Sequence, residues 1–83
     1  MDRPPEHPGI ELMRRIIDMK MTYAEFARTA DISPSTVSEL ISCKRSLSID
    51  SAEKIANFFD TDIEYWLSKQ MRYDIYSKSI SKI

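Results

Sequence analysis

The chain has 83 residues, 42% of them hydrophobic, and a formal net charge of −1 at pH 7. A chain this short buries only about 60% of the surface that its unfolded form exposes, which leaves room for one small core and excludes a second. The single glycine excludes a Gly-rich phosphate loop and disfavours tight hairpins, so we expect an all-α fold. No apolar stretch approaches the length of a membrane span or the pattern of a signal peptide, so we expect a cytoplasmic protein without a membrane partner.

The first eight residues hold three of the four prolines, which predicts a flexible, Pro-rich, non-helical arm over residues 1–8. The rest of the chain, residues 9–83, is expected to form a single domain of five helices. Their bounds follow from apolar residues at three- and four-residue spacing and from capping residues. The predicted helices cover residues 9–19, 23–30, 34–42 and 49–59, and a last stretch from 62 to at least 76.

Capping residues set several of these helix starts. Thr22 with Glu25, and Thr61 with Glu64, have the spacing of a capping box, in which a hydroxyl and a carboxylate each satisfy a free backbone amide. Ser33 precedes Pro34 and is predicted to cap the third helix, because proline suits the first helical position.

The last predicted helix carries two apolar stripes. The stripe expected to close the core comprises Ile63, Trp66, Leu67 and Met71. The second stripe comprises Tyr73, Tyr76, Ile80 and Ile83. Because the second stripe extends beyond the domain, we expect Tyr73, Tyr76 and Ile80 to form a homodimer interface. A frayed tail with scattered apolar residues is the alternative.

Residues 22–42 have the pattern of a helix-turn-helix, two short helices joined by a turn of three or four residues. Ala27 stands where a larger side chain would push the two helices apart, and Val37 and Leu40 are expected to pack the second helix against the first. The solvent-facing side of the second helix carries short hydroxyl residues, namely Ser33, Ser35, Thr36 and Ser38. Such side chains permit close approach to the major groove and donate to phosphates or bases.

Charge along the chain supports a nucleic-acid partner. Residues 14–45 carry six Lys or Arg against four acidic residues, whereas residues 50–64 carry one Lys against five acidic residues. We expect Lys44 and Arg45 to hold phosphates after the second helix of the motif, although solvated loop charges are the alternative. Glu39 places a negative charge on the same surface, where it could accept from a cytosine amino group but is otherwise repelled by phosphate.

Four segments of the sequence resemble one known family over almost the whole chain. They are HPGIEL (7–12), MTYAEFA (21–27), DISPSTVSELISCKRSLS (31–48) and EYWLSKQMRYDI (64–75). These residues resemble HigA-type antitoxins, also called plasmid-maintenance antidote proteins, of the Xre/Cro-like helix-turn-helix group. The HPG opening and the aromatic-Trp-Leu run are the most specific, because generic Cro-like domains lack both.

The resemblance implies a Cro/lambda-repressor-like domain of five helices with an extended C-terminal helix. It also implies a homodimer that binds a palindromic operator of two half-sites, represses its own operon and neutralises a small basic toxin of the RelE-like ribonuclease type. In such a complex, Thr22 and Tyr23 would hold the DNA backbone together with Lys44 and Arg45.

The chain departs from the family pattern at three places. Asp31 in the turn and Cys43 after the recognition helix stand where the family usually has glycine, and Tyr23 stands where glutamine is common in the wider group. Asp tolerates a left-handed backbone better than Cys does. These departures bear on DNA affinity and sequence preference more than on the fold.

Other functions have little support in the sequence. His7 and Cys43 are the only His and Cys, so neither a metal site nor a nucleophile-base pair is expected, and we predict no enzyme activity and no cofactor. The competing hypothesis is a protein-interaction module, or a phage- or plasmid-type Xre regulator without a toxin partner or with weak DNA binding. Glu39 and the net acidity favour that hypothesis, whereas the hydroxyl row and the Lys44-Arg45 pair favour DNA binding.

Overall fold

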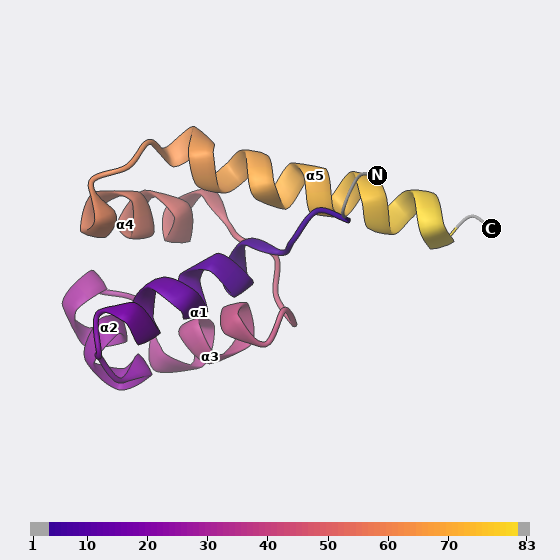
Figure 1. The fold of residues 1–83 in the computed structure, drawn as a ribbon. Helices are drawn as coiled ribbons and strands as arrows, with labels where there is room; N and C mark the ends of the chain where they lie inside the picture. The colour runs from indigo at the N-terminus through magenta and orange to yellow at the C-terminus, as the bar shows by residue number, and fades with distance from the viewer. Residues whose placement is uncertain (1–3, 82–83) are drawn as a thin grey trace.

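The computed structural model describes residues 4–81, and the described residues form five helices and no strand (Figure 1). The helices are α1 (Pro8–Asp18), α2 (Tyr23–Ala30), α3 (Pro34–Ile41), α4 (Ile49–Phe59) and α5 (Ile63–Ser81). The predicted all-α, five-helix fold is confirmed, and α2 and α4 have the predicted bounds. The first helix begins one residue before its predicted start, because Pro8 occupies its first turn. No helix in the described part of the chain is both long and apolar enough to cross a membrane.

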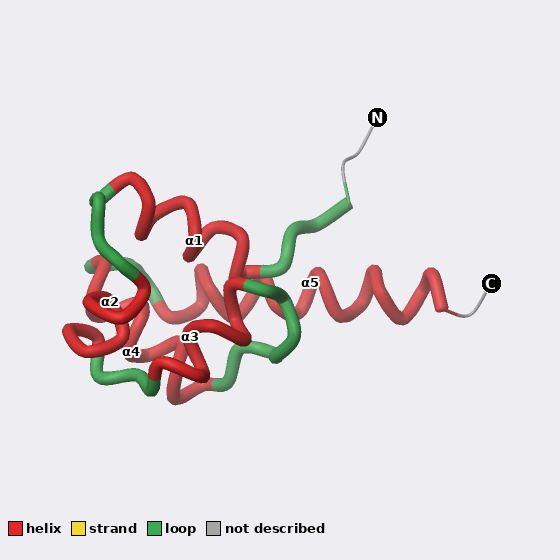
Figure 2. The backbone as a smooth tube through the Cα atoms, turned by 90° about the horizontal axis from the view of Figure 1, so that it is seen from below, coloured by secondary structure: helices red, strands yellow, loops and turns green. Residues whose placement is uncertain are grey.

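The helices are arranged in two groups around one core. In the view of Figure 1, α4 and α5 lie above α1, α2 and α3, and α3 lies at the lower surface. Helix α4 packs on α5, α3 packs on both α1 and α2, and α1 also contacts α5. The C-terminal half of α5 projects beyond the other helices (Figure 2), which gives the molecule principal extents of 41 × 24 × 22 Å.

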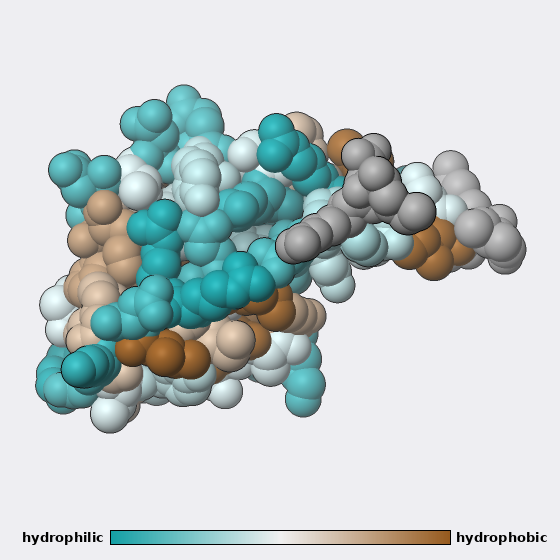
Figure 3. All heavy atoms as spheres, in the orientation of Figure 1, coloured by the Kyte–Doolittle hydropathy of each residue, from teal (hydrophilic) through white to brown (hydrophobic). Residues whose placement is uncertain are grey.

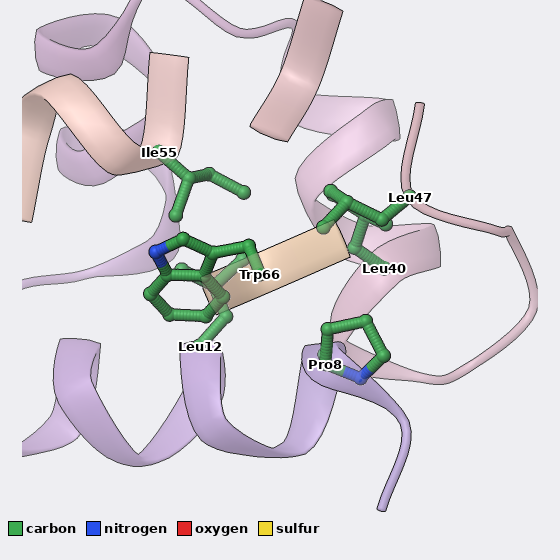
Figure 4. A pocket seen from close by; sticks show the side chains of 7 residues that line it. Pro8, Leu12, Leu40, Leu47, Ile55 and Trp66 are labelled. Carbon is green, nitrogen blue, oxygen red and sulfur yellow. The ribbon is translucent and has the colours of Figure 1, made fainter. Parts of the chain in front are cut away.

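Trp66 of α5 is fully buried at the centre of the core. Residues from α1, α3, α4 and the loop before α4 surround it, as Figure 4 shows, namely Pro8, Leu12, Leu40, Leu47 and Ile55. The space between these side chains does not admit a water molecule. Phe26 and Ala27 bring α2 into the same core, so all five helices share one apolar interior.

One prediction about α5 was wrong. Met71 is 57% exposed and does not close the core, whereas Gln70 beside it is only 5% exposed. Gln70 lies four residues after Trp66 and shares its face of the helix. Met71 lies about 140° away from Trp66 around the helix axis. The amide of Gln70 is satisfied in the interior, since its Oε1 accepts from the Leu47 amide at 2.8 Å and its Nε2 donates to Asp74 at 2.8 Å.

The helix starts follow the predicted capping residues with one exception. The capping box of α2 is present, because Thr22 Oγ1 accepts from the Glu25 amide at 3.0 Å and Glu25 Oε1 accepts from the Thr22 amide at 2.9 Å. The box predicted for Thr61 and Glu64 was wrong. Helix α5 begins at Ile63, and Thr61 Oγ1 instead accepts a hydrogen bond from the indole Nε1 of Trp66 at 2.8 Å.

Four residues at or just after helix ends have a left-handed backbone, with φ between 56° and 62°. They are Lys20, Asp31, Cys43 and Asp60, and none of them is glycine. Glycine is the usual residue at such positions because it has no Cβ to crowd the following carbonyl. Helices α1 to α4 therefore end without the residue that suits the geometry best.

Candidate nucleic-acid interface

Helices α2 and α3 form the predicted helix-turn-helix. Asp31 turns the chain with φ 61°, and the Ile32 amide donates to the Ala27 carbonyl at 2.9 Å. Ser33 then caps α3 by accepting from the Thr36 amide at 3.2 Å. Ala27 is buried, as predicted, so the two helices pack closely and α3 is held at a fixed angle to α2.

The hydroxyl row comprises Ser33 at the N-cap of α3 and three residues within the helix, and the Ser33 hydroxyl lies 3.4 Å from that of Ser35. Ser33 donates to Thr36 Oγ1 at 2.8 Å, so these two side chains hold each other at the start of the helix. Ser35 and Ser38 lie one helical turn apart and are both exposed. The opposite side of α3 is buried through Val37 and Leu40. The recognition helix therefore presents a face of short polar side chains while its other face is fixed in the core.

Glu39 lies next to Ser38 and does not carry an isolated charge. The Nε of Arg45 donates to Glu39 Oε1 at 2.7 Å, and Nη2 of the same guanidinium contacts the same oxygen at 2.5 Å. Both side chains are about half exposed. The negative charge that the sequence placed on this surface is thus paired with the positive charge expected to bind phosphate.

The loop after α3 carries the two basic residues to the C-terminal end of the recognition helix. Cys43 adopts φ 62°, and the Lys44 amide donates to the Glu39 carbonyl at 2.9 Å. The Lys44 and Arg45 side chains are both exposed. Burial raises the pKa of the Cys43 thiol, so this thiol stays protonated near neutral pH.

Thr22 and Tyr23 lie at the N-terminus of α2. The Thr22 hydroxyl is engaged in the capping box, whereas the Tyr23 side chain is exposed. Hydrogen bonds from the Thr22 backbone amide and hydroxyl lower the pKa of Glu25. Free amides and the helix dipole make such an N-terminus favourable for an anion, and the Glu25 carboxylate occupies part of it in this structure.

His7 was assigned to a flexible arm by its position in the sequence, but it is buried against the loop after α3. Its Nδ1 accepts from the Gly9 amide at 2.9 Å and caps α1, and its Nε2 lies 2.9 Å from the Arg45 carbonyl. With Nδ1 as acceptor, Nε2 carries the proton and donates to that carbonyl. The edge of the ring also packs on Tyr73 of α5, 5.0 Å between ring centroids. Burial lowers the pKa of His7.

Gly9 forms a close contact between the start of α1 and the backbone near the end of α3. A Cβ built on Gly9 would lie 1.7 Å from the Leu40 carbonyl oxygen and 3.1 Å from His7 Nδ1. Only glycine permits this approach of α1 to the end of α3. The HPG run, noted in the sequence only as a family signature, therefore caps α1 and holds α3 and its following loop in place.

The second apolar stripe of α5 lies on the part of the helix that projects from the domain. Tyr73 is half-buried against His7, while Tyr76 and Ile80 are exposed. Ile83 lies outside the described residues. Figure 3 shows hydrophobic side chains on this projecting segment, beside more polar ones. Such a surface fits a protein partner.

Residues 11–66 match the family model described as helix-turn-helix, which includes both helices of the motif and most of the core. The chain belongs to the helix-turn-helix family. The matched residues include α3 with its exposed polar face.

Several relatives within the helix-turn-helix family are antidote proteins. The chain is 34% identical to an addiction module antidote protein of the HigA family from Coxiella burnetii, over 98% of this chain and 92% of that one, with a TM-score of 0.86. It is 27% identical to the Pseudomonas aeruginosa antitoxin HigA solved with the higBA promoter, over 93% of this chain and 85% of that one, with a TM-score of 0.88. The resemblance to HigA-type antidote proteins is confirmed.

A curated relative is longer than this chain. Virulence-associated protein A' of Dichelobacter nodosus is 33% identical over 76 residues, which cover 90% of this chain and 65% of that protein. The chain thus spans just under two thirds of that relative's length.

Proposed function

We propose that this chain is a dimeric DNA-binding repressor and antitoxin, which binds a palindromic operator through α3 and neutralises a RelE-like ribonuclease toxin. The observation that carries the DNA-binding part is the exposed polar face of α3, with Lys44 and Arg45 at its end. The opposite face of α3 is fixed by the core and by Gly9. The similar antitoxin from Pseudomonas aeruginosa was solved with its promoter, which supports the same role here. A repressor of this kind acts in the cytoplasm, where its operator lies.

The residues divide into two groups by their place around α3. Those proposed to face the base edges are Ser33, Ser35, Thr36, Ser38 and Glu39. Those proposed to hold the phosphates are Thr22, Tyr23, Lys44 and Arg45. Arg45 suits its role although it is paired, because a guanidinium has five N–H groups and only two of them contact Glu39.

A single recognition helix covers only a few base pairs, so two copies must act together for selective binding. Repressors of this kind present two recognition helices about 34 Å apart through a two-fold dimer. The buried faces of α1 to α4 are used within the domain, whereas Tyr76 and Ile80 on α5 have no such use. We therefore place the dimer interface on Tyr73, Tyr76 and Ile80.

The acidic surface of α4 and the start of α5 supports a basic protein partner. All five acidic residues between positions 50 and 64 are exposed, namely Asp50, Glu53, Asp60, Asp62 and Glu64. Lys54 is the single basic residue in that stretch. Complementary charge of this kind speeds and orients association with a basic toxin.

The decisive experiment compares two duplexes and one protein partner. Fluorescence anisotropy would measure binding of the purified chain to the DNA upstream of its own gene and to a scrambled duplex of equal composition. Co-expression with a short basic reading frame next to the gene would then test for a stable complex and for relief of that protein's toxicity. Preference for the upstream duplex together with a neutralising complex supports the proposal. A protein that forms the complex without preferring its own upstream DNA would be an interaction module instead.

A further inference from the structure

Glu39 occupies a position on α3 from which a side chain could contact a base. Ser35, Ser38 and Glu39 share one face of the helix, because residues three and four apart lie side by side. The adjacent residues Val37 and Leu40 are buried, which fixes the rotation of the helix about its axis. Glu39 therefore lies on the polar face that the proposed function places in the major groove.

The carboxylate of Glu39 has one occupied oxygen and one available oxygen. Both contacts from Arg45 go to Oε1. Oε2 accepts no hydrogen bond from any residue in the described range 4–81, and the side chain is 45% exposed. The two nitrogens of Arg45 both hold Oε1, so the carboxylate is tethered through that oxygen to the loop after α3. Oε2 is thus an available acceptor on the exposed polar face of α3.

Pairing with Arg45 removes the main obstacle to placing a carboxylate near DNA. An isolated negative charge would be repelled by the phosphates, whereas the Glu39–Arg45 pair has no net charge. The pair is held in place from behind, because the Arg45 carbonyl accepts a hydrogen bond from His7. Position and charge compensation are therefore both built into the fold.

The chemistry of a carboxylate acceptor selects among the base edges. In the major groove cytosine presents an amino donor, whereas guanine presents two acceptors and thymine presents an acceptor and a methyl group. Adenine presents a donor beside an acceptor, which an amide matches better than a carboxylate does. We propose that Glu39 recognises the amino group of a cytosine in each half-site and so determines which operator is bound. This inference rests on the proposed DNA-binding function.

A selection from randomised duplexes tests the inference without knowledge of the operator. The wild type, Glu39→Ala and Glu39→Gln would each be used to enrich bound sequences, and circular dichroism would check that each variant is folded. For the wild type we expect one C·G pair fixed at a symmetric position in both half-sites. Glu39→Ala should lose the preference at that position alone, and Glu39→Gln should shift it to A·T. In anisotropy titrations, replacing that cytosine by thymine should weaken wild-type binding roughly tenfold or more and leave Glu39→Ala binding nearly unchanged.

The results separate this inference from the proposed function. If the wild type and Glu39→Ala enrich the same sequence at every position, the role of Glu39 is overturned while operator binding stands. If the wild type enriches no sequence at all, both are overturned. Arg45→Ala provides a further check, because it should weaken binding to all duplexes and reduce the cytosine preference, since Glu39 loses its charge partner. A loss of that preference in Arg45→Ala alone would assign the base contact to Arg45.

Discussion

Gly9 at the start of α1 lies directly against the main-chain carbonyl of Leu40 near the end of α3, so close that a Cβ on Gly9 would stand 1.7 Å from the carbonyl oxygen. The first helix therefore contacts the backbone of α3 as well as its buried side chains. This contact explains why the only glycine of the chain stands inside a helix, where glycine is otherwise unfavourable.

Replacing Gly9 by Ala should destabilise the protein by about 2 kcal/mol or more, because either α1 or the end of α3 has to shift. Urea unfolding followed by circular dichroism measures the effect. Ile17→Ala on the exposed side of the same helix is the matched control and should cost much less. Equal stability of Gly9→Ala and the wild type would show that α1 does not rest on α3 in solution.

Ala27→Leu should overpack the crossing of α2 and α3 and cost about 1–3 kcal/mol. Ala24 lies on the exposed side of the same helix, so Ala24→Leu introduces the same side chain without the clash and should be nearly neutral. Thermal melting of the two variants makes the comparison. Similar melting temperatures would argue against the observed packing of the motif.

Replacing both Lys44 and Arg45 by Ala should weaken binding to every duplex to a similar extent. It should also flatten the dependence of log affinity on log salt by about one to two units, because fewer counterions are released. Titrations at several salt concentrations measure this slope. Arg72 is exposed on α5 and does not belong to α3 or the loop after it, so Arg72→Ala is the control and should leave the slope unchanged. A double variant with the wild-type slope would remove both residues from the interface.

The stability of the protein should fall as the pH drops below about 6.5, the usual pKa of histidine. Burial lowers the pKa of His7 in the folded state, so the unfolded chain takes up the proton first. The stabilising contribution of the neutral ring is therefore complete above the unfolded pKa and is lost as pH falls through the folded pKa. Protonation of Nδ1 would also remove the acceptor for the Gly9 amide.

The matched variant for this pH effect is His7→Asn, whose carbonyl can still cap α1 but does not titrate. Thermal melts at neutral pH and at about pH 5 should show a smaller loss of stability on acidification in the variant than in the wild type. Identical losses in both proteins would exclude His7 as the cause.

Changing Tyr76 and Ile80 to Glu should convert the proposed dimer into a monomer, because two charges would be buried at the interface. Sedimentation equilibrium at micromolar concentration measures the oligomeric state. Met71 and Ile75 are exposed on a different side of α5, so Met71→Glu with Ile75→Glu is the control and should remain dimeric. If the Tyr76 and Ile80 variant remains a dimer and the Met71 and Ile75 variant becomes a monomer, the interface lies on the Met71 side of α5 instead.

Local signals in the sequence predicted most of the fold. Capping residues such as Thr22 and Ser33, followed by apolar spacing, placed the helix starts within about one residue because these interactions involve near neighbours. The error at Met71 arose where two apolar stripes overlap on one helix. Periodicity alone could not show that the buried face continues through a polar residue, Gln70, whose partner Leu47 lies 23 residues away.

The candidate site was predicted in outline, but its internal contacts were not. The row of hydroxyl residues on α3 and the Lys44-Arg45 pair followed from spacing. The pairing of Glu39 with Arg45 spans the loop after α3, and the contact of His7 with the Arg45 carbonyl spans 38 residues. Neither contact leaves a periodic signal, so the sequence left Glu39 between a cytosine contact and repulsion by phosphate, and placed His7 in a flexible arm.

The left-handed helix ends at Lys20, Asp31, Cys43 and Asp60 have a consequence for how this protein can change over time. Each has a Cβ in a backbone conformation that glycine adopts without steric cost. Substitution by glycine at any of these positions could therefore raise the free energy of unfolding. Lys20 and Asp60 lie outside the recognition helix and the loop after it. A substitution at Lys20 or Asp60 could therefore change the free energy of unfolding without altering any residue proposed to contact DNA.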